Sequence, residues 1–199
     1  MSKLFYIMGK SATGKDHIYE NLLSDQALNL KPFVIYTTRP MRKNEADGRE
    51  YFFRDEDFLD RQRRAGRIIE ERLYHTVQGP WYYFTADDGQ ITDKDDSRYL
   101  GIGTLESYCR LVSYFGRDRL VPLYIETDDG YRIERALKRE KKQEKPDYRE
   151  MCRRFLADSE DFSEDKLQAA GIEKRFLNND RPLEEVTDEI REFILAQQE

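Results

Sequence analysis

The sequence predicts an α/β fold in which helices cover both faces of a parallel sheet. Apolar runs of strand length alternate with runs of helix length at both ends of the chain. A glycine-rich loop joins the first of these strands to the first helix. Between Tyr51 and Thr85 the helices thin out and strands cluster, which predicts a small β-rich insertion. Ligands of such folds bind at the carboxyl ends of the parallel strands, where the glycine-rich loop lies.

The first part of the chain carries two predicted core strands around one helix. The apolar run Leu4–Met8 predicts the first strand, and the segment after the glycine-rich loop predicts a helix over Lys15–Leu23. The run Phe33–Thr37 predicts the second strand. The insertion then carries a helix, Asp55–Ala65, among three short strands: Tyr51–Phe53, Ile68–Tyr74 and Trp81–Thr85.

In the C-terminal part, predicted strands and helices alternate again. Its predicted strands are Tyr99–Gly103, Val121–Glu126 and Glu173–Leu177. Its predicted helices are Thr104–Phe115, Asp129–Lys142, Asp147–Asp161, Ser163–Ala169 and Pro182–Ala196. The Asp-rich segment Asp87–Asp96 indicates a solvated loop, with a metal site as the less favoured alternative, and Lys141–Asp147 indicates a hinge.

The glycine-rich loop reads Gly9-Lys10-Ser11-Ala12-Thr13-Gly14-Lys15-Asp16. Its glycines let the backbone fold around an anion, so that N–H groups and the following helix N-terminus point at phosphate oxygens. Lys15 is placed to reach the β and γ phosphates of a nucleoside triphosphate. The loop therefore predicts triphosphate binding, and a plain glycine-rich turn is the alternative for the motif taken alone. Asp16 stands where such loops usually carry the hydroxyl that ligates Mg²⁺.

Composition narrows the range of functions. The 199 residues include 37% charged residues, and the mean hydropathy is −0.89. No apolar run approaches the length of a membrane span, and a net charge of −6 argues against binding along a nucleic-acid polymer. Cys109 and Cys152 form no metal-type or redox-type spacing, and the N-terminus carries no leader pattern, so we expect a cytoplasmic protein.

Basic residues gather in two segments of this acidic chain. Such local clusters suit small phosphorylated ligands, because cations there neutralise phosphate without a continuous basic face. The alternative is two solvated helix faces whose glutamates pair with nearby cations. The clusters consist of Arg39, Arg42, Lys43 and Arg49, and of Arg132, Arg135, Lys138, Arg139, Lys141, Lys142, Lys145, Arg149, Arg153 and Arg154.

A second motif follows the first helix and strand. Its residues are Thr37-Thr38-Arg39-Pro40-Met41-Arg42, then Glu45, Gly48 and Tyr51. The order and spacing resemble the Thr-Thr-Arg-x-x-Arg…Glu-x-x-Gly-x-x-Tyr signature of guanylate kinases, which lies at the same place relative to the phosphate loop. The resemblance extends over nearly the whole chain and suggests a divergent bacterial-type member of this family.

The resemblance implies a three-layer P-loop NTPase core with a parallel sheet, a small β-rich NMP-binding insertion and a helical lid. The core would comprise residues 1–36, 97–137 and 156–199, the insertion about 37–90 and the lid about 138–155. It also implies transfer of the γ-phosphoryl of ATP to GMP or dGMP with Mg²⁺. Partners would then be small-molecule nucleotides, and the chain would be a monomer or a homodimer.

The resemblance also assigns roles to residues of the insertion. Arg39, Arg42 and Tyr51 match the positions that grip the acceptor phosphate. Arginine suits this role because its planar fork binds phosphate bidentately and stays charged. Glu70 matches the glutamate that accepts from the guanine N1 and N2 donors. Two further acceptor-binding residues, Tyr83 and Thr85, fall in a Tyr-Phe-Thr run where the family has Tyr-Gly-Ser/Thr.

On the donor side, the phosphate loop from Gly9 to Asp16 would bind ATP. Arg139 and Arg154 resemble lid arginines that act on the transferring phosphoryl group, with Arg153 as a substitute for Arg154. Surface ion pairing is the alternative for both. Asn178 matches the segment that lies near the ATP adenine. The catalytic set implied is Lys15, Arg39, Arg42, Arg139 and Arg154.

Three departures from the family pattern bear on metal handling and base choice. Asp16 replaces the loop hydroxyl, and its carboxylate is a candidate Mg²⁺ ligand. Gly101 and Gly103 stand where the family has carboxylates, a loss that Asp16 or Glu106 would have to offset. Ile35 replaces a base-contacting serine, and one lost hydrogen bond of about 1 kcal/mol relaxes base choice.

Two other functions remain open at this stage. Loss of base contacts would permit another phosphorylated acceptor, such as a sugar phosphate. The missing carboxylates would also suit a non-catalytic binding module of the same fold, although a retained Lys15 and phosphate loop argue against it.

Overall fold

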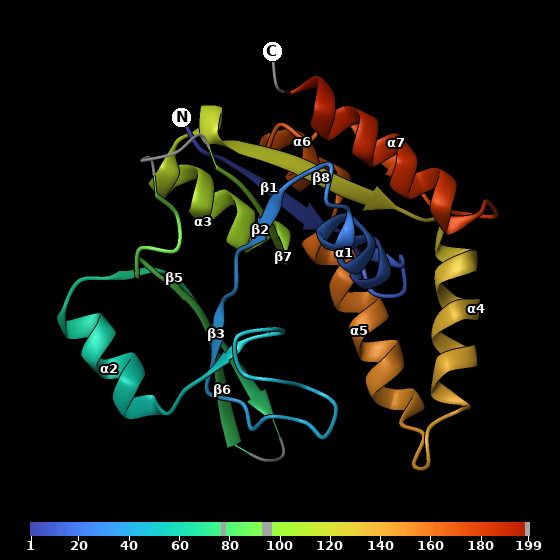
Figure 1. Cartoon of the computed structure of the whole chain (residues 1–199). Helices are drawn as coiled ribbons and strands as arrows, with labels where there is room; N and C mark the ends of the chain where they lie inside the picture. The colour runs from blue at the N-terminus through green and yellow to red at the C-terminus, as the bar shows by residue number, and fades with distance from the viewer. Residues whose placement is uncertain (77–78, 93–96, 198–199) are drawn as a thin grey trace.

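A parallel five-stranded sheet forms the centre of the computed structural model, which describes residues 1–76, 79–92 and 97–197. Its strand order is β2-β7-β1-β8-β9, and every neighbouring pair is parallel (Figure 1). The predicted α/β class is therefore confirmed. The strands are β1 (Lys3–Met8), β2 (Leu30–Pro32), β7 (Arg98–Gly103), β8 (Leu120–Glu126) and β9 (Arg175–Leu177).

Alternating residues of β1 divide the core into two layers. Phe5 and Ile7 pack in one buried cluster with residues of α1 (Lys15–Ser24) and α7 (Leu183–Ala196). Leu4, Tyr6 and Met8 pack in the other with residues of α3 (Leu105–Phe115) and α6 (Glu164–Ala169). Each β1 residue from Leu4 to Met8 is at most 2% exposed, as expected for a central strand covered on both faces.

A second, four-stranded sheet forms the β-rich part of the chain. Its order is β4-β3-β6-β5, with β3 antiparallel to β6 and parallel to β4. The helix α2 (Glu56–Arg64) packs on it through Leu59, which shares a buried cluster with Tyr36 and Phe84. The strands are β3 (Tyr36–Thr37), β4 (Phe52–Phe53), β5 (Ile68–Thr76) and β6 (Gly79–Ala86).

The segment predicted as one core strand, Phe33–Thr37, instead passes between the two sheets. Residues Leu30–Pro32 pair with β7, and Tyr36–Thr37 pair with β6. Between them, the Val34 N–H donates to the Gln90 side chain at 3.0 Å, and the Gln90 amide donates to the Val34 carbonyl at 3.0 Å. This amide satisfies the backbone where no strand is adjacent, so the chain leaves one sheet for the other.

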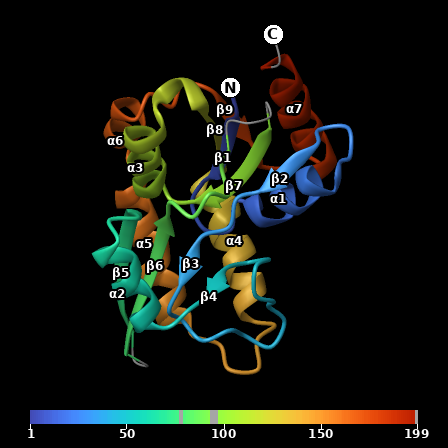
Figure 2. The same ribbon diagram turned by 60° about the vertical axis from the view of Figure 1, so that its left-hand side comes forward.

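The remaining predicted helices are present, with small displacements at their ends. α4 (Asp129–Glu140) and α5 (Tyr148–Asp161) form a pair joined by the predicted hinge, and η1 (Arg117–Arg119) precedes β8. Figures 1 and 2 show that this pair and the β-rich part extend from the same end of the main sheet, and Figure 1 shows them on opposite sides. In the predicted Asp-rich loop, residues 93–96 lie outside the described residues.

Candidate functional site

The phosphate loop connects the end of β1 to the first residue of α1, Lys15. A Cβ on Gly9 would lie 2.5 Å from the Ile125 carbonyl oxygen, so only glycine permits the loop to pass this close to β8. Gly14 has a φ of +85°, in the left-handed region that favours glycine. Both glycines of the motif are therefore required by backbone geometry, and Lys15 and Asp16 begin the helix whose N-terminus faces the loop.

Residues distant in the sequence hold this loop in place. The buried Arg132 of α4 donates to the Ser11 carbonyl at 3.1 Å and pairs with Asp158 of α5 at 3.1 Å. Asp158 in turn accepts from the Ser11 N–H at 2.7 Å. On the other side, the buried Asn178 amide donates to the Thr13 carbonyl at 2.6 Å. The loop is thus fixed before any ligand binds.

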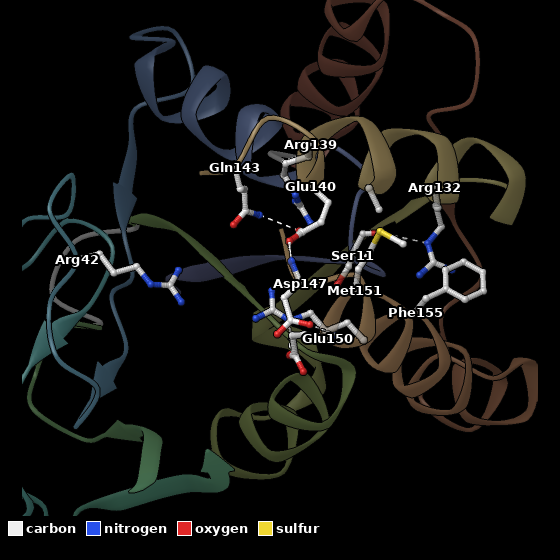
Figure 3. Close-up of a pocket in the computed structure, with 12 residues that line it drawn as sticks. Ser11, Arg42, Arg132, Arg139, Glu140, Gln143, Asp147, Glu150, Met151 and Phe155 are labelled. Atoms are coloured by element: carbon white, nitrogen blue, oxygen red, sulfur yellow. Dashed lines mark hydrogen bonds and ion pairs between the residues drawn. The ribbon is translucent and has the colours of Figure 1, made fainter. Parts of the chain in front are cut away.

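A cavity of about 370 Å³ lies beside the loop, between it and the α4–α5 pair. Ser11, Arg139 and Arg154 line it, and Arg42 reaches it from the β-rich side, opposite the residues of α4 and α5 (Figure 3). Hydrogen bonds from Arg153, and secondarily from Arg154, lower the pKa of Glu150 in this cavity to about 2. Of the four arginines in the lining, Arg132 is buried, whereas Arg42, Arg139 and Arg154 are exposed and suit an anionic ligand.

The predicted acceptor residues Arg39, Tyr51 and Tyr83 lie together in a larger cavity of about 1020 Å³. The Arg39 guanidinium is 3% exposed and lies 5.4 Å from the centre of the Tyr51 ring. Its Nε donates to the Tyr83 hydroxyl at 3.1 Å, and its two terminal nitrogens donate to Glu45 at 2.9 and 2.8 Å. Burial raises the pKa of Tyr51 to about 12, so its hydroxyl stays protonated as a donor.

Glu70 and Thr85 form a neighbouring buried group with Arg72. The Thr85 hydroxyl donates to Glu70 at 2.8 Å, and Arg72 donates to both Glu70 oxygens, at 3.0 and 3.3 Å. Burial opposes the charge of Arg72, but its interactions with Glu70, Tyr6 and Tyr74 together raise the pKa of the guanidinium. In the β5–β6 register, Glu70 is opposite Thr85 and Arg72 is opposite Tyr83. These four side chains therefore share one face of the sheet.

Arg42 and Arg154 line both cavities. Asp16 of the phosphate loop lines the larger one. The triphosphate-type loop, the lid-type arginines and the acceptor-type residues therefore converge at the carboxyl end of β1, although they come from segments far apart in the chain. This convergence allows a donor and an acceptor, both anionic, to meet between the cavities.

Comparison with known proteins finds similarity to guanylate kinases. The guanylate kinase family model matches residues 1–82. A guanylate kinase of Porphyromonas gingivalis is 30% identical over 127 residues, which are 63% of this chain and 65% of that protein. A guanylate kinase of Nitrosomonas europaea is 41% identical over 76 residues, 38% of this chain and 37% of that protein. The N-terminal part of the chain therefore resembles guanylate kinases in sequence.

The fold resembles that of a solved guanylate kinase along nearly the whole chain. The crystal structure of guanylate kinase from Anaplasma phagocytophilum matches with a TM-score of 0.62 over 99% of this chain and 86% of that chain, at 20% identity. The sequence matches are shorter, and the chain spans less than two thirds of the length of the two curated relatives named above.

Packing against Tyr6 accounts for Gly101 and Gly103 on β7, which stand where guanylate kinases have carboxylates. A Cβ on Gly101 would lie 2.8 Å from the Tyr6 ring, and one on Gly103 would overlap the Tyr6 hydroxyl. Tyr6 is fully buried and its hydroxyl bonds Ser107 at 2.9 Å, while burial raises its pKa to about 12. The Tyr6 side chain therefore occupies the space that larger residues on β7 would need.

Two further differences from the guanylate kinase pattern, Ile35 and Phe84, are also explained by packing. Ile35 is 6% exposed and belongs to the core cluster that contains Tyr6. Phe84, which replaces the family's glycine, is fully buried and stacks on Tyr36 with ring centres 5.1 Å apart. Both side chains are therefore core residues.

Sequence reasoning missed four residues of this site: Tyr6, Arg72, Arg132 and Asp158. Arg72 could have been found from the sequence. Residues i and i+2 of a β-strand point to the same face, which places Arg72 beside Glu70. Arg132 appeared only as one member of a basic cluster. Its contact with Ser11 joins residues far apart in the chain, and no local pattern indicates it.

The predicted metal ligand Asp16 is exposed at the start of α1. Among residues 1–76, 79–92 and 97–197, no three His, Cys, Asp or Glu side chains are grouped so that they could hold a metal ion. A single carboxylate beside the phosphate loop still fits Mg²⁺, which commonly binds through one or two carboxylates and substrate phosphates. Within the same described ranges, no helix has the length and apolar character that crossing a membrane requires.

Proposed function

We propose that this protein is an ATP:GMP phosphotransferase. The observation that carries the proposal is the convergence of a phosphate loop, two arginines that line both cavities and the signature residues Arg39 and Tyr51. The match of residues 1–82 to the guanylate kinase family supports the assignment to this reaction.

On the donor side, the loop amides and Lys15 bind the β and γ phosphates of ATP, and the N-terminus of α1 adds its dipole. Asp16 is the residue that would hold Mg²⁺ together with the ATP phosphates. Bound there, the ion neutralises charge on the phosphates. Asn178 lies near the adenine of ATP, and its hydrogen bond to the Thr13 carbonyl holds the conformation of the phosphate loop.

On the acceptor side, Arg42 and Arg39 grip the GMP phosphate, and Tyr51 donates to it. Arg39 is pre-oriented by Glu45 and Tyr83, so little of its side-chain entropy is lost on binding. We assign Glu70, with Thr85, to the purine base, where a carboxylate accepts from an N–H donor of the ring. Positioning and charge neutralisation are what phosphoryl transfer requires of a protein, because the reaction needs little covalent chemistry from it.

Closure completes the site. We assign the moving parts to about 37–90 and about 138–155, on the core formed by 1–36, 97–137 and 156–199. Closure brings Arg139 and Arg154 onto the transferring phosphoryl group, where they stabilise its charge and exclude water. The ion pairs of Arg153 and Arg154 with Glu150 are exposed, so they exchange for phosphate at little cost.

The test is coupled ADP release from ATP and Mg²⁺ with GMP, dGMP, AMP, UMP, CMP, dTMP and ribose bisphosphate offered separately. We expect turnover with GMP and dGMP. Turnover with a sugar phosphate alone would contradict the assignment, and ATP binding without turnover on any acceptor would make the protein a binding module.

A further inference from the structure

Arg72 occupies most of the Glu70 carboxylate, which the proposed function assigns to the acceptor base. Ionised Glu70 offers about four lone-pair positions on its two oxygens. The Arg72 Nη2 and the Thr85 hydroxyl take two of these positions on Oε1, and the Arg72 Nε takes one on Oε2. One position on Oε2 remains for a ligand.

Arg72 is fixed in this place by a polar network. Its Nη1 donates to the Thr104 hydroxyl at 3.3 Å, and Thr104 exchanges hydrogen bonds with Ser107 at the start of α3. Ser107 bonds the buried Tyr6 hydroxyl. The network joins β5 of the β-rich part to β1 and α3 of the core. The Arg72 side chain is 9% exposed, and displacing it would leave Glu70, which is 1% exposed, as an unpaired buried charge.

Guanine presents two donors to a carboxylate, its N1–H and its 2-amino group, and reading both takes one free position on each oxygen. Here Oε1 has none. We infer that this site recognises only the N1–H and therefore accepts 6-oxopurine nucleoside monophosphates as a class, GMP and IMP alike. Arg72 is the residue that makes the site accept both. IMP keeps the N1–H and lacks the 2-amino group, so it loses no bond. This inference rests on the proposed function and specifies its substrate class.

The experiment compares GMP with IMP. Turnover with ATP and Mg²⁺ gives kcat and KM for each acceptor, and calorimetric titration gives their affinities without turnover. For the wild-type protein we expect kcat/KM values for GMP and IMP within about tenfold of each other, because a second bond to a carboxylate would separate them by more. Discrimination against IMP of a hundredfold or more, at equal folding, overturns the inference.

Two variants test the role of Arg72 directly. Arg72→Met frees both Glu70 oxygens, so we expect the ratio of kcat/KM for GMP to that for IMP to rise about tenfold or more, through KM for GMP rather than kcat. Arg63→Met is the matched control, because Arg63 makes the same paired contact with Glu71, which is adjacent to Glu70 in β5. We expect it to leave the ratio unchanged. An unchanged ratio in folded Arg72→Met overturns the role of Arg72.

The two failures are distinguishable. If neither GMP nor IMP binds or turns over in the wild-type protein, the proposed function fails and the inference fails with it. If GMP turns over and IMP does not, the function stands and the inference fails. Thermal unfolding of each variant separates loss of folding from loss of recognition, and the wild-type comparison decides the substrate class without any variant.

Discussion

At the scale of single residues, the two signature arginines differ in how they are held. Arg39 is buried, and Glu45 binds both of its terminal nitrogens. Arg42 is exposed, and its side chain makes no ion pair with any residue that the structure describes, although it lines both cavities. In the proposed function, Arg39 is therefore the ordered cation of the acceptor site, and Arg42 is the one that would move onto phosphate.

Replacing Arg42 tests this difference. We expect Arg42→Met to lower kcat/KM for GMP by more than about tenfold, because a charge-assisted bond to phosphate is lost. Arg64→Met, at another exposed arginine, on α2, is the control and should leave kcat/KM near the wild-type value. Steady-state kinetics of the purified variants, with thermal unfolding as a check on folding, measure the effect. Equal kinetics of the two variants would remove Arg42 from the site.

The Arg39–Glu45 pair predicts a pH dependence of stability. Hydrogen bonds from Arg39 hold the pKa of Glu45 below its ordinary value. A depressed carboxyl pKa stabilises the fold above the unfolded pKa, about 4.3, and this stability is lost as the pH falls through the folded pKa. We expect the thermal midpoint of the wild-type protein to exceed that of Glu45→Gln at pH 7 and the difference to shrink steadily below pH 4. A difference independent of pH would contradict this.

At the scale of elements, two helices far from the phosphate loop in sequence maintain its shape. Arg132 on α4 and Asp158 on α5 both bond Ser11, and the Phe155 ring lies 4.6 Å from the Arg132 guanidinium. The α4–α5 pair therefore has two functions in this site. Its base holds the loop, while its far end carries Arg139 and the exposed hinge.

Replacing the buried Arg132 tests whether the α4–α5 pair anchors the phosphate loop. We expect Arg132→Met to lower the free energy of unfolding by about 3 kcal/mol, because Asp158 keeps its charge without its partner. Arg153→Met breaks an exposed ion pair on the same helix pair and should cost about 0.5 kcal/mol. Urea unfolding of both variants measures the difference, and equal losses would show that Arg132 is not a structural anchor.

At the scale of the whole molecule, Arg139 and Arg154 lie across the smaller cavity from the β-rich part, so the proposed phosphoryl transfer would require closure. The chain contains two cysteines, and both are exposed. Cys152 lies on α5 and Cys109 on α3, which places one on the proposed lid and one on the core.

Labelling these cysteines with a fluorescent donor and acceptor reports that motion. We expect energy transfer to change when a non-hydrolysable ATP analogue and GMP are added together, and to change less with GMP alone. Single-label samples control for direct effects of the ligands on the dyes. Energy transfer that stays constant with both ligands bound would contradict lid movement relative to the core.

Local pattern was sufficient for most of the fold. Helix and strand positions follow from the spacing of apolar residues, so the helices were predicted closely, and the segment Phe33–Thr37 failed because its division depends on the distant Gln90. The same limit applies to the site. Arg39, Arg42 and Tyr51 belong to one contiguous motif and line one cavity, whereas Glu70 lies buried against Thr85.

The sequence by itself determined the α/β class, the phosphate loop and the residues of the acceptor motif, because these depend on short-range periodicity and on residue types at fixed spacing. Only the tertiary structure decided what surrounds them. Tyr6 filling the space beside Gly103, Arg72 occupying Glu70 and Arg132 holding Ser11 are contacts between separate elements. Burial and hydrogen-bond capacity at those contacts depend on how the sheets and helices pack, and that packing is a property of the whole chain.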